Sequence, residues 1–114
     1  REAKNINSLY LARQSILPDG VLTVWKKLGQ GVIAELQIPA DAKRVNAYGS
    51  RKCRFSKAVV ISLSAGTQAY GQHDPAFLYK VGETVIPDAF DPDPCVECSP
   101  GIHAFITRLE AENY

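Results

Sequence analysis

The fold class follows from one stretch, Val21-Leu-Thr-Val-Trp-Lys-Lys-Leu-Gly-Gln-Gly-Val-Ile-Ala-Glu-Leu-Gln-Ile38. Val21–Lys26 and Gly31–Ile38 are short, mainly apolar runs, and such runs are typical of strands when turn residues bound them. The Gly29-Gln-Gly31 turn between the two runs predicts a β-hairpin. We therefore expect a domain built mainly from strands.

Outside the hairpin, the sequence predicts further strands. Ala58–Leu63 has the density of β-branched residues that is typical of a buried strand. Phe77–Val81 and Ile102–Ile106 are also expected to be strands, and Arg44–Ala47 is expected to be a short extended piece. Residues 87–94 are rich in proline, which cannot donate to a strand ladder, so we expect an irregular connector there.

The C-terminal residues predict a short helix. Thr107-Arg-Leu-Glu110 matches a capping box, in which the threonine side chain accepts from an amide and the glutamate reaches back. The expected fold class is therefore α+β: a strand-rich single domain with about five strands and a short C-terminal helix. We expect residues 1–17 to be a lead-in segment and residues 18–114 to form the domain.

Length and composition indicate an ordinary globular domain with an uneven charge distribution. The chain has 114 residues, of which 46% are hydrophobic and 22% charged, and its net charge is +1. Residues 42–73 contain no acidic side chain but several basic ones, and the balance reverses over residues 74–97. Two interpretations remain open: the two halves pair across the fold, or the basic half presents a face for an anion or a nucleic acid.

The remaining composition bears on location and context. The chain contains no methionine, so we expect it to be part of a longer protein. It has neither a long apolar run nor a signal-peptide pattern, and we expect no membrane contact. Three cysteines, an odd number, argue against a disulfide framework and favour a reducing compartment. The expected location is the cytoplasm.

Several motifs occur in the order of a known domain. They include Ile38-Pro-Ala-Asp-Ala-Lys-Arg44, Ser50-Arg-Lys-Cys-Arg54, Tyr79-Lys-Val-Gly-Glu83 and Glu97-Cys-Ser-Pro-Gly-Ile-His103. Over residues 12–114 the chain resembles an uncharacterised C-terminal domain that follows pentapeptide repeats in bacteriophage, prophage and large-virus proteins. The resemblance implies that residues 1–17 are the end of a pentapeptide-repeat coil. It also implies a cytoplasmic location in the host cell or association with the virion, and it assigns no activity.

Cysteine and histidine residues raise the question of a zinc site. Cys95, Cys98 and His103 have the opening spacing of a zinc knuckle, and Cys53 would complete a tetrahedral set. The alternative is that these cysteines are small buried apolar residues. The main expectation is no metal, with zinc as the alternative.

A second resemblance is local. Residues 101–114 look like the strand-then-helix element of ADP-ribosyltransferases, whose aromatic residues cradle nicotinamide. By that resemblance Tyr114 is the stacking tyrosine and His103 replaces the strand tyrosine. The implied cofactor is NAD.

The basic segment has its own candidates. Arg44, Arg51, Lys52 and Arg54, interleaved with aromatic residues, are of the kind that binds phosphate backbones, so nucleic acid is one possible partner. A solvated or internally paired run of charges is the alternative.

These observations favour a non-enzymatic accessory module of a phage-type protein, acting through contacts with a host or phage protein. The expected binding residues lie on the Arg51–Arg54 turn and near the C-terminal strand: Arg51, Lys52, Arg54, His103 and Tyr114. The alternative is a small NAD- or nucleotide-binding domain related to ADP-ribosyltransferases. A convergent pocket holding His103, Tyr114 and an arginine favours this alternative, whereas a flat surface favours the module.

Overall fold

The hairpin forms one edge of a four-stranded antiparallel sheet. The computed structural model describes residues 17–47, 49–93 and 100–114. In it, β1 (Leu22–Lys27) pairs with β2 (Ile33–Ile38) in a register that runs from Leu22 opposite Ile38 to Lys27 opposite Ile33. The turn η1 (Gly29–Gly31) joins them. Next to β2 lies β5 (Ala58–Leu63), followed by β8 (Thr84–Val85), so the order is β1-β2-β5-β8.

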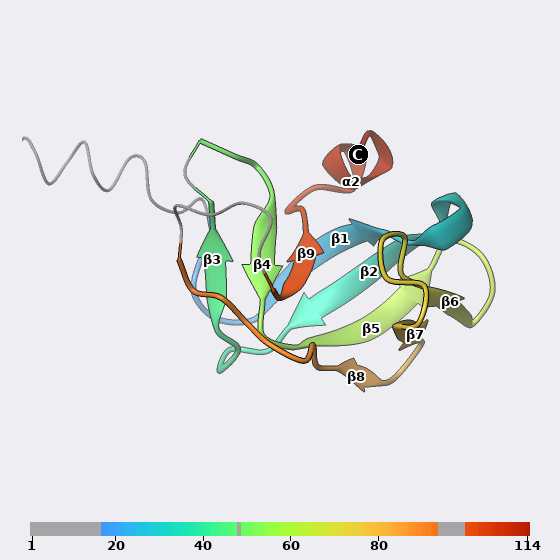
Figure 1. Ribbon diagram of the computed structural model, residues 1–114, viewed down its shortest axis with the longest axis horizontal. Coiled ribbons are helices and arrows are strands. Elements are labelled where there is room, and N and C mark those ends of the chain that lie inside the picture. The colour runs from blue at the N-terminus through green and yellow to red at the C-terminus, as the bar shows by residue number, and fades with distance from the viewer. Residues whose placement is uncertain (1–16, 48, 94–99) are drawn as a thin grey trace, which may run out of the picture.

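Two smaller sheets complete the strand content, as Figure 1 shows. The first has the order β3-β4-β9 and consists of β3 (Arg44–Asn46), β4 (Cys53–Phe55) and β9 (Ile102–Ala104). The second pairs β6 (Gln68–Tyr70) with β7 (Leu78–Lys80). All of these pairs are antiparallel.

The core is built from the inward-facing residues of the strands. In β1 and the residue after it, Val24 and Leu28 are fully buried, because side chains of one parity point to one face of a strand. The same core contains residues from all three sheets, among them Leu36, Phe55, Val60, Tyr79 and Ile102. Leu17 packs against its edge.

The C-terminal segment is tied back to β1. Trp25 and Phe105 exchange two main-chain hydrogen bonds, of 2.7 and 2.8 Å. The helix α2 (Arg108–Glu112) follows, with Thr107 as its N-cap: the Thr107 side chain accepts from the Glu110 amide at 3.3 Å and its hydroxyl donates to the Glu110 carboxylate at 2.7 Å. Figure 1 shows α2 next to β1, on the same side as β9. Segments from both ends of the described chain therefore meet.

The structure bears out the strand-rich single domain and the capped C-terminal helix but corrects the strand count. The described residues form nine strands in three sheets rather than about five. The strands not predicted are β4, β6 and β8, which have only two or three residues each, too few for an alternating pattern to be visible. The expected lead-in segment, apart from Leu17, lies outside the described residues. None of the helices in the described part of the chain is long and apolar enough to cross a membrane.

Candidate functional site

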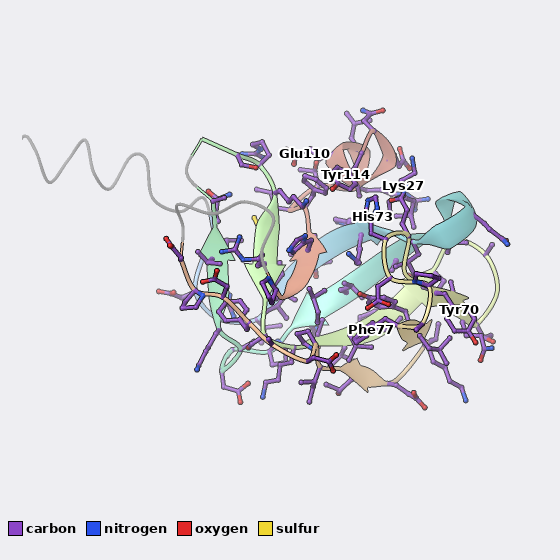
Figure 2. The ribbon with its side chains drawn as sticks, viewed as in Figure 1. Lys27, Tyr70, His73, Phe77, Glu110 and Tyr114 are labelled. Carbon is purple, nitrogen blue, oxygen red and sulfur yellow. The ribbon has the colours of Figure 1, made fainter. Side chains whose placement is uncertain are left out.

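A cavity of about 380 Å³ lies where β1, β9, the β6–β7 loop and the C-terminal residue meet. This volume is in the range of small-ligand pockets. Figure 2 shows Lys27, His73 and Tyr114 close together beside this loop, with Phe77 below them. The polar and aromatic residues that line the cavity are Lys26, Lys27, Lys52, Gln72, His73, Asp74, Phe77, Tyr79, Asp88, His103, Phe105 and Tyr114.

Lys26 is the most unusual side chain of the cavity. Its Nζ donates a hydrogen bond of 2.8 Å to the carbonyl oxygen of His103. Burial, and then the nearby charge of Lys52, lower the pKa of Lys26 from 10.5 to about 8. A lysine shifted in this way within a cavity is a mark of functional sites. The Lys26 amine is thus partly neutral near physiological pH.

Lys52, which is the residue just before β4, also lines the cavity. Its side chain is buried, with 8% of the residue exposed. The Lys52 Nζ donates to the Tyr114 hydroxyl at 2.8 Å and lies 5.0 Å from the centroid of the Tyr114 ring. The ring of Tyr114 in turn contacts Phe105, at 5.3 Å between centroids, and the edge of His73, at 6.0 Å. An ammonium group and a cluster of aromatic rings in edge-to-face and tilted contact therefore lie side by side.

The β6–β7 loop supplies His73 and Phe77. It is closed by hydrogen bonds from the Gly71 amide to the Phe77 carbonyl and from the Phe77 amide to the Asp74 carbonyl, of 2.9 and 3.1 Å. A Cβ at Gly71 would lie only 2.8 Å from the Asp74 carbonyl oxygen, so the tight closure requires glycine there. The loop then places Phe77 against Tyr79, with their ring centroids 5.1 Å apart.

The charges around the cavity are mixed, with lysines in excess. The carboxylates of Asp74 and Asp88 line it together with the three lysines. The Lys27 Nζ, at the rim, contacts the Glu112 carbonyl oxygen at 3.4 Å. Burial, and then the nearby charge of Asp74, raise the pKa of the Tyr79 hydroxyl.

The structure brings together three of the five residues expected to bind. Lys52, His103 and Tyr114 line the same cavity. Arg51 and Arg54 do not line it, although both flank Lys52 closely in sequence.

Arg51 points toward the C-terminal helix instead. Its guanidinium forms an exposed ion pair with Glu110, with nitrogen–oxygen distances of 2.5 and 3.2 Å. The hydrogen bond from Arg51 holds the pKa of Glu110 below its usual value. This ion pair joins the turn that precedes β4 to α2.

Arg54 is buried, with 1% of the residue exposed. Its guanidinium donates to the Asp91 carbonyl oxygen at 3.0 and 3.1 Å and to the Asp93 carbonyl oxygen at 2.6 Å. Arg54 therefore fastens the 87–93 connector to β4. Asp88 of this connector lines the cavity, so Arg54 helps to hold in place a segment that contributes to the site.

The residues of the expected zinc set are not brought together within the described part of the chain. Cys53 is buried, and its burial raises the thiol pKa to about 12. In the β4–β9 pairing, Cys53 lies opposite Ala104 and Arg54 lies opposite His103. The side chains of Cys53 and His103 therefore point to opposite faces of the sheet. Cys95 and Cys98 lie outside the described residues, and residues 17–47, 49–93 and 100–114 contain no cluster of three metal-ligating side chains.

Lys26 is the residue that the sequence analysis missed, although a signal for it exists. Val24 and Leu28 point into the core, and Lys26 has the same parity along the strand. A lysine at a strand position that faces the core is rare, because burial of an ammonium group is unfavourable. The alternation itself therefore identifies Lys26 as a candidate functional residue.

The fold and the cavity define a small strand-rich domain with a lysine-lined, aromatic-walled pocket. By sequence the chain belongs to a family of unknown function (DUF5758), whose family model matches residues 13–111. No curated protein and no solved structure matches the chain.

Proposed function

We propose that this domain binds a small organic anion in the cavity between β1, β9 and the β6–β7 loop. The observation that carries this proposal is the convergence of the Lys26 and Lys52 side chains, which are close enough for the charge of one to depress the pKa of the other. Two neighbouring ammonium groups in a partly buried site repel each other. An anionic ligand offsets this repulsion and gains charge-assisted hydrogen bonds.

The walls of the cavity narrow the class of ligand. The rings of His73, Phe105 and Tyr114 form a contiguous aromatic surface beside the lysines. Aromatic surfaces favour planar rings by stacking, and ammonium groups favour phosphate or carboxylate. A nucleotide or a nucleotide-like metabolite combines both features. This corresponds to the nucleotide-binding alternative drawn from the sequence. That alternative expected an arginine beside His103 and Tyr114, and the cavity has lysines there instead.

The proposal predicts saturable binding of a nucleotide that depends on Lys52. We expect AMP, ADP-ribose or NAD to give a calorimetric titration curve at low salt, and Lys52→Met to weaken binding at least about tenfold through loss of a charge-assisted hydrogen bond. The matched control is Lys43→Met, because Lys43 is an exposed lysine that does not line the cavity. Absence of heat and of thermal protection with every ligand, or unchanged affinity in Lys52→Met, would contradict the proposal.

Protein contacts are the second candidate function, in the setting of a phage-type protein with pentapeptide repeats. The specific observation in its favour is an exposed apolar residue of α2, Leu109, which is 66% exposed and precedes Glu110, the partner of Arg51 in an exposed ion pair. Protein contact surfaces combine an apolar centre with a polar rim.

A charge reversal tests this second candidate. We expect Arg51→Glu to abolish capture of a host or phage protein from lysate, because the introduced carboxylate would repel Glu110 and reverse the local charge. Arg108→Glu is the control, since Arg108 is also exposed and pairs within α2. Identical captured proteins with wild type, Arg51→Glu and Arg108→Glu would refute this surface.

A further inference from the structure

We propose that Lys26 forms an imine with its ligand, so that the cavity takes an anionic aldehyde or keto acid as a covalently bound substrate or cofactor. The inference rests on the proposed function, because the cavity must first hold the anionic group of that ligand. It goes beyond the proposed function by assigning a bond-forming role to one nitrogen atom.

The position of the Lys26 amine suits this role. Lys26 lines the cavity, and its Nζ is oriented by a hydrogen bond to the His103 carbonyl oxygen. A neutral amine has two hydrogens and one lone pair. When one hydrogen is donated to the carbonyl, the lone pair remains available for attack on a carbonyl carbon. The hydrogen bond therefore holds the nucleophile in place without blocking it.

The surroundings of Lys26 raise the fraction of its side chains that carry a neutral amine. With a pKa of about 8, about a quarter of the Lys26 side chains are neutral at pH 7.5, against about one in a thousand for an ordinary lysine. Burial contributes most of this shift, and the Lys52 ammonium contributes the rest. The other ionisable groups that share the cavity are Lys27, Lys52, His73, Asp74, Tyr79, Asp88, His103 and Tyr114.

Lys52 has a second use in this arrangement. Its ammonium group, which donates to the Tyr114 hydroxyl, lies on the same cavity wall as the Tyr114 ring. A ligand whose phosphate or carboxylate approaches Lys52 would place its ring against Tyr114 and its carbonyl group near Lys26. A neutral lysine beside a second cation is a known way of activating an amine for imine chemistry.

The chemistry is redox-neutral and needs no further reactant. The Lys26 lone pair forms a carbon–nitrogen bond with the carbonyl carbon, and a proton passes from nitrogen to oxygen to give a carbinolamine. Loss of water, which carries away the former carbonyl oxygen and both amine protons, leaves a carbon–nitrogen double bond. The overall change is amine plus carbonyl to imine plus water.

Reductive trapping tests the inference directly. The probe is pyridoxal 5′-phosphate, which carries an aldehyde, an aromatic ring and a phosphate, with cyanoborohydride to reduce the imine to a stable secondary amine. We expect peptide mapping at pH 7.5 to show Lys26 labelled at least about tenfold faster than Lys43, Lys57 or Lys80, because Lys26 combines a much larger neutral fraction than an ordinary lysine with a place in the cavity. Lys26→Arg should eliminate this fast labelling, and the labelling rate at Lys26 should rise with a midpoint near pH 8.

Pyridoxal, which lacks the phosphate, separates this inference from anion binding. If the proposed function also holds, Lys52→Met slows labelling by the phosphate probe and leaves labelling by pyridoxal much less affected. If nucleotides bind but Lys26 is labelled no faster than the surface lysines, the imine site is overturned and anion binding stands. If both probes label Lys26 selectively and at equal rates while no nucleotide binds, imine formation at Lys26 stands, but the proposed function and the requirement for an anionic group both fall.

Discussion

Arg54→Met is expected to lower the free energy of unfolding by about 3 kcal/mol at pH 7. The Arg54 guanidinium is buried and donates to two carbonyl oxygens of the 87–93 connector. Methionine fills much of the same space but removes these donors, so the carbonyls of Asp91 and Asp93 lose charge-assisted hydrogen bonds. Urea denaturation followed by tryptophan fluorescence measures the change, because Trp25 is the one tryptophan of the chain.

Two further arginine variants make this result specific. Arg54→Lys keeps the positive charge but not the planar fork of donors, so we expect an intermediate loss of stability. Arg108→Met removes an exposed arginine that pairs with Glu112 one helical turn away, and we expect a loss of less than about 0.5 kcal/mol. A loss for Arg54→Met no larger than that for Arg108→Met would show that Arg54 does not fasten the connector.

Lys26→Met is expected to stabilise the domain, and to do so only below about pH 10. The folded-state pKa of Lys26 is about 8, whereas the unfolded value is about 10.4. Below pH 8 both states hold the proton, and holding it in the folded state is unfavourable by on the order of 3 kcal/mol. Between pH 8 and about 10.4 the unfolded state binds more protons, so this penalty declines and stability rises with pH.

The measurement is the difference in unfolding free energy between Lys26→Met and wild type across this range. The difference should be greatest at pH 6–8 and approach zero near pH 10.5. The raised pKa values of Cys53 and Tyr79 act in the opposite sense at alkaline pH, but both groups are present in both proteins and cancel in the difference. A pH-independent difference, or a Lys26→Met protein that is less stable at pH 7, would contradict the burial of a charged lysine.

The fold was predictable where local chemistry determines structure. Glycines between two apolar runs predicted the β1–β2 hairpin, a β-branched run predicted β5, and Thr107 with Glu110 predicted the start of α2. The strand β4 was not predicted, because its central residue is Arg54, whose burial depends on carbonyl groups from a distant connector. Such a dependence has no signature in the neighbouring residues.

The candidate site was predictable only in part, for a similar reason. Arg51, Lys52 and Arg54 are near neighbours, and nothing in the local sequence distinguishes them as binding residues. In the structure Arg51 pairs with Glu110, Lys52 lines the cavity, and Arg54 donates to carbonyl groups of the 87–93 connector. This separation depends on the register between β4 and β9, which is a tertiary property. The position of Lys26, by contrast, was already implied by the alternation along β1.

The hydrogen bond between the Lys26 side chain and the His103 carbonyl joins residues 77 positions apart. The cavity is therefore a property of the whole tertiary structure, and neither the β1–β2 hairpin nor the C-terminal strand and helix can form it alone. A ligand that occupies it binds the native state and not the unfolded chain, so its binding free energy adds to the free energy of folding. Any ligand of this cavity would therefore couple occupancy of the site to the stability of the fold, and a higher concentration of that ligand would raise the folded fraction.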